Sequence, residues 1–253
     1  MTLPNPIAIQ MWTLRDLVAA DFADTLRQVA RIGYGAVEFA GYGDLPAADV
    51  RRMMDDLGLV PAGAHVGIAQ LEEDFDRVAD FHLELGCTNI IVPGPPAGFE
   101  RTAANWAALG SRIAALLPLA ARRGIALHYH NHGGELARFD GRPALDILLQ
   151  SAGAGLGAEI DVYWVKFAGD DPAEAVSRRA GTCHMVHLKD MAHGATPRDV
   201  EVGEGVLDWP SIFHACREAG VEWYVVEMDN CPKPPLESIE LALRNLRRMG
   251  IVS

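Results

Sequence analysis

The sequence predicts an α/β protein with a single (β/α)8 barrel domain, and three observations lead to this fold class. Short apolar runs alternate with amphipathic stretches along all 253 residues, as in repeated strand–helix units. Five helical stretches end in a glycine shortly before the next apolar run, at Gly33, Gly58, Gly86, Gly124 and Gly220. Such a glycine closes a helix and turns the chain into the following strand. A barrel of this class has about 250 residues, so we expect one domain over residues 1–253.

We predict eight strands from the apolar runs. They are Ile7–Met11, Ala36–Phe39, Val60–His65, Asn89–Val92, Ile125–His130, Ala158–Asp161, His184–His187 and Glu222–Glu227. An open doubly wound sheet is the main alternative, and it would need a glycine-rich phosphate loop after an early strand. The first strand is followed instead by Thr-Leu-Arg-Asp, which favours the barrel.

Helical spacing of apolar residues fills the intervals between the strands. The clearest helices are expected at Asp24–Ile32, Glu72–Leu85, Ala104–Arg122 and Leu236–Met249. The longest segment without a regular pattern runs from Lys189 to Val206, after the seventh strand. A loop of this length is often a lid or a binding loop, and a mobile insertion is the alternative.

Composition restricts the class of partner. The formal net charge of −12 opposes binding to a nucleic-acid backbone and suits a metal cation or a small neutral substrate. Cys87, Cys183, Cys216 and Cys231 show no CxxC spacing, so we expect free thiols. No signal peptide or membrane span is recognised. We therefore expect a cytoplasmic protein without nucleic-acid or membrane partners, and a homo-oligomer is compatible with the sequence.

Four metal-capable side chains recur about one strand–helix unit apart: His130, Asp161, His187 and Glu227. Each stands at or near the end of a predicted strand. The carboxyl ends of the strands converge on one face of a parallel barrel, so these side chains are expected to share one divalent ion. Mixed histidine and carboxylate ligands suit Mn²⁺, Co²⁺, Fe²⁺ or Zn²⁺ better than Ca²⁺. We expect Mn²⁺, with Co²⁺, Zn²⁺, Fe²⁺ or Mg²⁺ as alternatives.

The fifth and sixth strands each place more than one polar side chain on a single face. His128, His130 and His132 alternate along the chain and share a face, which three histidines seldom do as ordinary core residues. His130 is our preferred ligand, and His128 is the alternative. Glu159 lies on the same face as Asp161, and two inward carboxylates repel each other unless a cation or a proton lies between them. Asp161 could instead cap the next helix.

Further residues near strand ends are expected to line the same pocket. Lys189 follows the seventh strand and can stabilise a negatively charged oxygen, although an exposed lysine is the alternative. Asp229 shares a face with Glu227 and is a second choice of ligand. Glu38 and His65 end two earlier strands and would complete the lining of the pocket.

With these motifs in view, the chain resembles the xylose isomerase-like TIM barrels of the sugar phosphate isomerase/epimerase family. The resemblance covers nearly the whole chain and is carried by TLRQVARIGYGAVEF, YHNHGGEL, EIDVYWV, VHLKDM, VGEGVLDW and VVEMD. It implies that Asp161, His187 and Glu227 match three of the four metal ligands of the ketose 3-epimerases. The fourth ligand of those enzymes, a glutamate of the fifth strand, is replaced here by His128 or His130.

The resemblance implies a metal-dependent isomerase or epimerase that acts on a small keto-sugar or keto-polyol by proton abstraction and a metal-stabilised enediolate. The alternative is a dehydratase or eliminase acting on a 3-keto sugar or keto-inositol, whose relatives share the YHNHGGEL form. A nuclease and a non-catalytic sugar-binding protein are less well supported. Catalytic roles are expected for Glu227, His128 and Lys189. Substrate contacts are expected from Glu38, His65, His132, Glu135, Trp164 and His193, with Trp164 as an apolar wall for a sugar ring.

Overall fold

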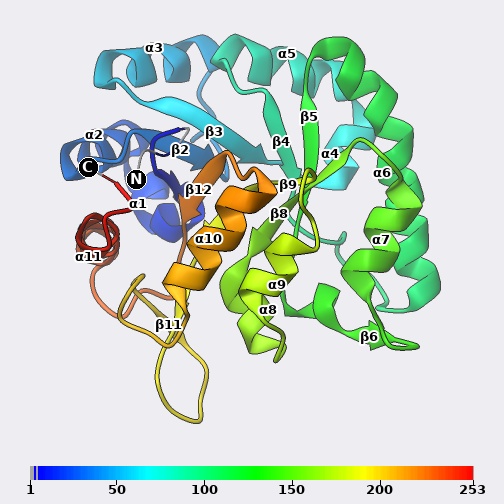
Figure 1. Ribbon diagram of the computed structural model, residues 1–253. Coiled ribbons are helices and arrows are strands. Elements are labelled where there is room, and N and C mark those ends of the chain that lie inside the picture. Colours follow the sequence, from blue (N-terminus) through cyan, green and yellow to red (C-terminus); the bar gives the residue numbers. More distant parts are fainter. Residues whose placement is uncertain (1–2, 4, 253) are drawn as a thin grey trace.

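The computed structural model describes residue 3 and residues 5–252, and Figure 1 shows a barrel wrapped by helices. In this part of the chain, eight parallel strands close in the order β1-β12-β9-β8-β5-β4-β3-β2. The predicted (β/α)8 class and the single domain are confirmed. The strands are β1 (Ala8–Gln10), β2 (Ala36–Phe39), β3 (Val60–His65), β4 (Asn89–Val92), β5 (Ala126–His130), β8 (Leu156–Asp161), β9 (Cys183–Leu188) and β12 (Trp223–Val226). Each corresponds to a predicted strand, with ends that differ by at most one or two residues.

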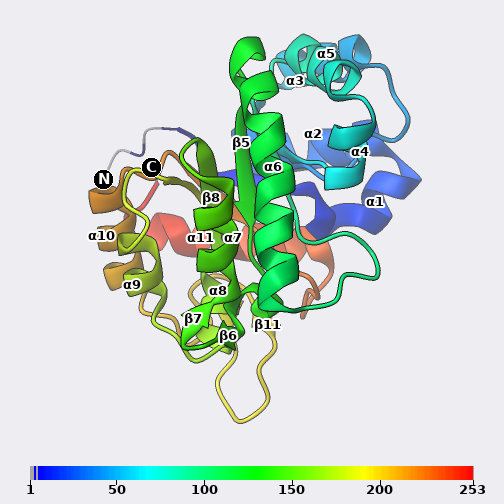
Figure 2. The same ribbon diagram turned by 90° about the vertical axis from the view of Figure 1, so that its right-hand side faces the viewer.

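Helices follow the strands and cover the outside of the barrel (Figures 1 and 2). The α-helices are α1 (Arg15–Ala20), α2 (Phe22–Ile32), α3 (Ala47–Leu57), α4 (Ile68–Glu73), α5 (Phe75–Leu85), α6 (Ala103–Arg123), α7 (Ala144–Ala152), α8 (Val162–Phe167), α9 (Pro172–Ser177), α10 (Trp209–Ala219) and α11 (Pro235–Arg248). Short 3-10 helices occupy Met11–Leu14 and Gly133–Leu136. All five predicted glycine stops have positive φ.

The single helix predicted over Glu72–Leu85 is wrong at its start. The chain breaks between α4 and α5 at Asp74, whose side chain accepts a hydrogen bond from the backbone N–H of Arg77. Aspartate is a strong N-cap because its oxygen satisfies a free N–H of the first turn. The helical spacing of apolar residues continues across this break, so the spacing alone did not reveal it.

A small apolar cluster fills part of the barrel interior. Its six buried members all lie on barrel strands: Ala8, Ala36, Ala62, Ile91, Met185 and Val225. Side chains two residues apart on a strand point to the same face. The residues that come after Ala8, Ala36, Met185 and Val225 on that face are therefore Gln10, Glu38, His187 and Glu227. Polar side chains thus stand on an apolar floor at the carboxyl end of the barrel.

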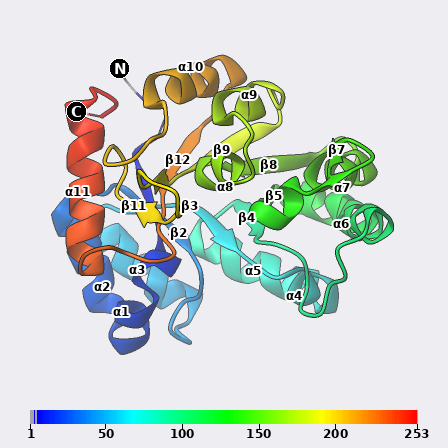
Figure 3. The ribbon, with the colours of Figure 1, turned by 90° about the horizontal axis from the view of Figure 1, so that it is seen from below.

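The segment after β9 is more ordered than the irregular loop predicted over Lys189–Val206. It forms an antiparallel hairpin from β10 (Asp190–Met191) and β11 (Asp199–Val200). This hairpin projects from the carboxyl end of the barrel in Figure 1 and crosses the view of that end in Figure 3. A second small hairpin joins β6 (Arg138–Phe139) to β7 (Arg142–Pro143).

The four cysteines carry free thiols in the structure, as expected. Among the residues that the structure describes, no helix is both long enough and apolar enough to cross a membrane.

Candidate metal centre

Four side chains that the sequence marks as metal ligands meet at the carboxyl end of the barrel. His130, Asp161, His187 and Glu227 each offer one ligand atom, and these atoms lie within 4.8 Å of one another. All four residues are buried. The structure thus brings together the set proposed from sequence spacing.

Strand register produces this meeting. His130 ends β5 opposite Glu159 of β8, and Asp161 ends β8 opposite His187 of β9. Glu227 directly follows β12, and its backbone N–H donates to the carbonyl of Leu188 at 3.2 Å. The strand ends converge on the carboxyl face of the barrel, although His130 pairs with Glu159 and His187 pairs with Val225.

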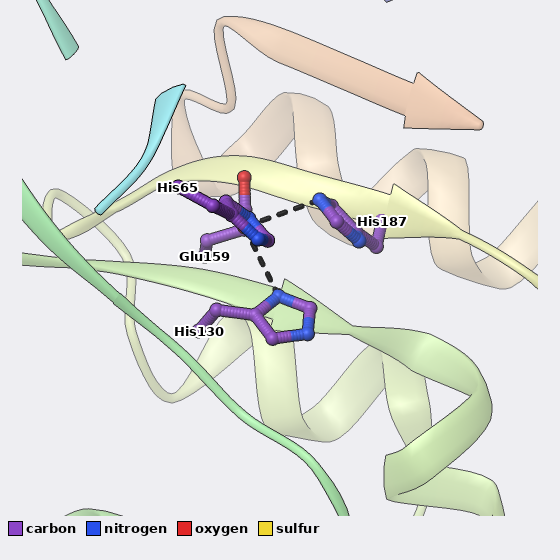
Figure 4. Close-up of side chains that lie close together, drawn as sticks. All are labelled: His65, His130, Glu159 and His187. Atoms are coloured by element: carbon purple, nitrogen blue, oxygen red, sulfur yellow. Dashed lines mark hydrogen bonds and ion pairs between the residues drawn. The ribbon is translucent and has the colours of Figure 1, made fainter. Parts of the chain in front are cut away.

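A second group of potential ligands overlaps the first and consists of His65, His130, Glu159 and His187 (Figure 4). Glu159 Oε2 lies 3.0 Å from His130 Nδ1 and 3.1 Å from the Nε2 atoms of both His65 and His187. Glu159 is fully buried. The sequence indicated that Glu159 points inward, but not that three imidazoles surround it.

Glu38 supports this group from β2. Its Oε2 lies 2.8 Å from His187 Nε2 and 3.2 Å from His65 Nε2. Gln10 donates to the same oxygen from Nε2 at 2.6 Å, and the Oε1 of Gln10 accepts from the backbone N–H of Trp12 at 2.9 Å. Glu38 is fully buried and lies against His187 and His65.

Unpaired buried atoms test whether the first group suits a cation. His130 Nε2 and Asp161 Oδ2 are buried and have no hydrogen-bond partner among the described residues. Buried polar atoms are nearly always satisfied, so an unpaired acceptor points to a missing partner. The other oxygen of Asp161 accepts from the backbone N–H groups of Tyr163 at 2.8 Å and Trp164 at 3.1 Å. Asp161 therefore caps α8 with one oxygen and leaves the other without a hydrogen bond, and the donor set fits a divalent cation.

Lys189 is buried in the same cluster rather than exposed. Its Nζ lies 3.5 Å from Glu227 Oε2 and 3.8 Å from Asp161 Oδ2, and it forms an ion pair with Asp229. Burial acts to lower the pKa of Lys189, but the charges of Glu227 and Asp161 raise it above its ordinary value. The ammonium is therefore retained. Asp229 pairs with this lysine and lies outside both groups of potential ligands.

Burial and neighbouring charges divide the cluster into neutral and charged groups. Burial raises the pKa of Asp161 to about 7, against the opposing effect of Lys189. Burial also acts to raise the pKa of Glu227, but Lys189 and His187 hold it well below its ordinary value. Burial and the charge of His187 lower the pKa of His130. A neutral imidazole beside an ionised carboxylate is the form that binds a metal ion.

The pKa values of His65 and His187 shift in the opposite direction to that of His130. Burial alone would lower the pKa of His65, but Glu38 and Glu159 raise it to about 9. The pKa of His187 is likewise raised well above its ordinary value, because Glu159 and Glu38 outweigh the effect of burial. The carboxylates Glu38 and Glu159 therefore favour a positive charge on both of these histidines.

His128 lies deeper in the barrel than the cluster. Its Nε2 is 3.3 Å from Asn89 Oδ1 at the start of β4, and its ring is 5.9 Å from His184 near the start of β9. It belongs to neither group of potential ligands. His128 does share a face with His130, but this depth does not support the catalytic role or the alternative ligand role expected for it.

The remaining residues that we expected to contact a substrate lie in three different environments. The ring of His132 lies 4.7 Å from that of His130 and 5.7 Å from that of Trp164, so both line the mouth of the site. Glu135 is buried and accepts from Tyr129 Oη at 3.1 Å and from the backbone N–H of His132 at 3.0 Å, which makes it a support for His132. His193 is exposed in the β10–β11 hairpin and belongs to neither group of potential ligands.

The comparisons with known proteins agree with the barrel fold. Residues 26–249 match the family described as "Xylose isomerase-like TIM barrel". An inosose dehydratase from Geobacillus kaustophilus (strain HTA426) is 23% identical over 247 residues, covering 82% of this chain and 80% of the relative.

Two solved structures share the fold. A sugar phosphate isomerase/epimerase from Parabacteroides distasonis ATCC 8503 superposes with a TM-score of 0.85 at 21% identity, covering 100% of this chain and 96% of the other. The IolI protein, solved with a zinc atom, gives a TM-score of 0.77 at 14% identity, covering 96% of this chain and 97% of the other. The match over most of the chain shows that this protein belongs to the xylose isomerase-like TIM barrel family.

Proposed function

We propose that the protein is a divalent-metal-dependent isomerase or epimerase that acts on a small keto-sugar or keto-polyol. One observation carries this proposal: His130, Asp161, His187 and Glu227 converge beside the buried ammonium of Lys189. The family contains sugar isomerases and epimerases as well as dehydratases, and each of these activities needs an acidified C–H bond next to a carbonyl.

His130, Asp161, His187 and Glu227 would hold the cation. When bound, a divalent cation polarises a substrate carbonyl and makes the neighbouring C–H bond more acidic. We propose Mn²⁺ as the first ion to test and Zn²⁺ as the second, because the structurally similar IolI protein was solved with zinc.

Glu227 is our candidate for the base that removes the proton. It is 5% exposed, and its pKa is held below its ordinary value despite burial, because Lys189 and His187 stabilise the carboxylate. The group is therefore ionised at neutral pH, which a base requires. Lys189 Nζ, at 3.5 Å from Glu227 Oε2, would donate to the substrate oxygen on which negative charge develops.

His132 and Trp164 support binding at the mouth of the site. Burial lowers the pKa of His132, so its imidazole is neutral at neutral pH and could act as a second proton carrier. The Nε1–H of Trp164 has no hydrogen-bond partner among the described residues, so a sugar hydroxyl could accept from it. The ring of Trp164 would stack against the apolar face of the sugar.

Dehydration of a 3-keto sugar or keto-inositol is the second candidate. The 23% identical relative is an inosose dehydratase, and dehydration begins with the same proton abstraction next to a carbonyl. The two activities differ in their second step, because the dehydratase expels a β-hydroxyl and the isomerase or epimerase returns a proton. Glu227 would serve as the base in both.

The test is incubation of the Mn²⁺- or Zn²⁺-loaded protein with a panel of keto-sugars and keto-inositols in D2O, with NMR and mass spectrometry of the products. Deuterium incorporation without loss of water supports the isomerase or epimerase. Loss of water identifies the dehydratase and overturns the first choice. Failure of both, across the panel and both ions, would contradict the proposed chemistry.

A matched pair of variants separates catalysis from folding. Glu227→Gln should abolish deuterium incorporation. Glu201→Gln should leave it unchanged, since Glu201 is also buried but bonds to Lys233 and Ser238 away from the cluster.

A further inference from the structure

We propose that Glu159 is a positioning residue that sets the tautomer of His130 and helps to set that of His187. His130 would then bind a cation through Nε2 and His187 through Nδ1. This inference rests on the proposed metal centre and deepens it, because it says which nitrogen of each histidine faces the ion and which residue decides it.

The two nitrogens of His130 have different surroundings. Nδ1 lies 3.0 Å from Glu159 Oε2, whereas Nε2 is buried without a hydrogen-bond partner among the described residues. An ionised carboxylate can only accept a hydrogen bond, so Nδ1 must carry the hydrogen. A neutral imidazole has one N–H and one lone pair. The lone pair is therefore on Nε2, the nitrogen free to face Asp161 Oδ2.

His187 has the opposite arrangement. Its Nε2 lies 2.8 Å from Glu38 Oε2 and 3.1 Å from Glu159 Oε2, so the hydrogen on Nε2 points to two acceptors. Its Nδ1 lies 3.1 Å from Glu227 Oε2. A ring nitrogen and a carboxylate oxygen that face each other this closely can both bind one cation in place of a shared proton.

One oxygen of Glu159, Oε2, takes this supporting role, while Oε1 is buried without a hydrogen-bond partner among the described residues. Its Oε2 already faces three ring nitrogens at 3.0 to 3.1 Å. His65 Nε2 lies between Glu159 and Glu38, at 3.1 and 3.2 Å, and so separates two buried carboxylates that would otherwise repel each other. Histidine ligands commonly donate their second N–H to a carboxylate, which fixes the ring and raises its basicity.

The two ligand histidines depend on Glu159 to different degrees. His187 Nε2 has Glu38 as a second and nearer acceptor, and Gln10 holds Glu38 in place at 2.6 Å. Glu159 is the carboxylate within hydrogen-bond distance of His130 Nδ1. Removing the charge of Glu159 should therefore disturb His130 more than His187.

The first test is the affinity for Mn²⁺ and Zn²⁺, measured by calorimetry in competition with a chelator. Glu159→Gln keeps the shape but removes the charge and adds an NH2 group, and we expect binding about 10–100-fold weaker. The control is Glu201→Gln, the same change at another buried glutamate, with binding equal to wild type. Equal affinity in Glu159→Gln and wild type would overturn the inference. It is equally overturned if Glu159→Gln loses the ion while Asp161→Asn and Glu227→Gln retain it, because Glu159 would then be a ligand.

The second test reads the tautomers directly, by long-range ¹H–¹⁵N NMR of protein labelled at histidine. In the Zn²⁺-loaded wild type we expect hydrogen on Nδ1 of His130 and on Nε2 of His187, and the His130 pattern should change in Glu159→Gln. The tautomer of His130 can also be measured in the metal-free protein. A His130 with its hydrogen on Nε2 would overturn this inference alone, whereas a wild type that binds no divalent ion would overturn the proposed function.

Discussion

Replacing Asp190 by asparagine tests how the segment after β9 is held at the carboxyl end of the barrel. The carboxylate of Asp190 is fully buried. Its Oδ1 accepts from the backbone N–H groups of Met191 (2.8 Å) and Leu207 (3.2 Å), and its Oδ2 accepts from the N–H groups of Gly203 (2.9 Å) and Gly205 (3.1 Å) and from Trp209 Nε1 (2.8 Å). One side chain thus ties β10 to the segment 203–207 that follows β11 and to the start of α10.

The expected loss can be worked out from these donors. An asparagine offers one oxygen and one NH2 group, and the oxygen fits best in place of Oδ2, where three donors meet. The NH2 group then faces the N–H groups of Met191 and Leu207, so at least two donors lose their acceptor. Each buried unsatisfied donor costs about 1–3 kcal/mol, so the free energy of unfolding should fall by about 2–6 kcal/mol. For a chain of this size, the Tm should fall by about 4–24 °C.

The Tm of Asp190→Asn would be measured by circular dichroism, and the local effect by amide hydrogen exchange over residues 190–209. We expect faster exchange at Met191 and Leu207, because their N–H groups lose their acceptor. Asp208→Asn is the matched control: Asp208 caps α10, and asparagine caps a helix about as well as aspartate. The reasoning is refuted if Asp190→Asn has the Tm of the wild type and keeps the exchange protection of Met191 and Leu207.

Three further outcomes are expected. Burial lowers the pKa of His128 from 6.5 to about 4, so the unfolded chain binds more protons than the folded chain in this range. The free energy of unfolding should therefore fall by about 3 kcal/mol as the pH drops from about 6.5 to 4. His128→Gln should lose this acid sensitivity in urea unfolding, and an unchanged pH dependence would contradict the prediction. Gly205→Ala should destabilise the fold by about 1–3 kcal/mol, because a Cβ would lie 2.2 Å from Asp190 Oδ1 and 2.3 Å from Met191 O. The control Gly67→Ala should change the Tm far less, because the nearest atom to its Cβ would be Gln70 Oε1 at 3.7 Å. Equal losses of Tm in the two variants would argue against the close approach at Gly205. Removal of a bound ion with EDTA should lower the Tm by about 5–10 °C, since an ion at 100 times its Kd adds about 2.7 kcal/mol, and an unchanged Tm would count against a bound ion.

The barrel could be predicted from sequence because its signals are local and repeated. Each strand is an apolar run, and glycines such as Gly33 and Gly124 stop the preceding helices in the left-handed conformation. Once the eight-fold repeat was recognised, topology alone brought His130, Asp161 and His187 to one face of the barrel. The break at Asp74 was missed because a cap interrupts a helix without interrupting its apolar spacing.

The sequence could not say how deep a side chain lies. His128 and His130 share a face and are equivalent in the alternating pattern of a strand, but two residues along a strand shift a side chain by about 6.6 Å. His128 pairs with Ile91 of the apolar floor and its ring lies near Asn89, whereas His130 reaches the cluster. The choice between them depends on how neighbouring strands are staggered, and that information is spread over the whole barrel.

Contacts between distant segments were the other part that the sequence could not supply. Glu159 could be predicted to face inward, but its contact with His65 joins residues 94 positions apart. Asp190 carried no recognisable signal, although it explains why the VGEGVLDW motif contains Gly205, where a Cβ would collide with it. The segment was therefore expected to be irregular, and instead it is a hairpin held by one buried carboxylate.

The most direct test of the metal centre is the number and affinity of divalent ions bound by wild type and by Asp161→Asn. Asparagine can keep the helix cap that Asp161 Oδ1 makes with Tyr163 and Trp164, while its NH2 group removes the oxygen that would bind the ion. We expect one Mn²⁺ or Zn²⁺ per wild-type chain and binding at least about 100-fold weaker in a variant that is folded normally. Undiminished binding by Asp161→Asn would contradict the proposed centre.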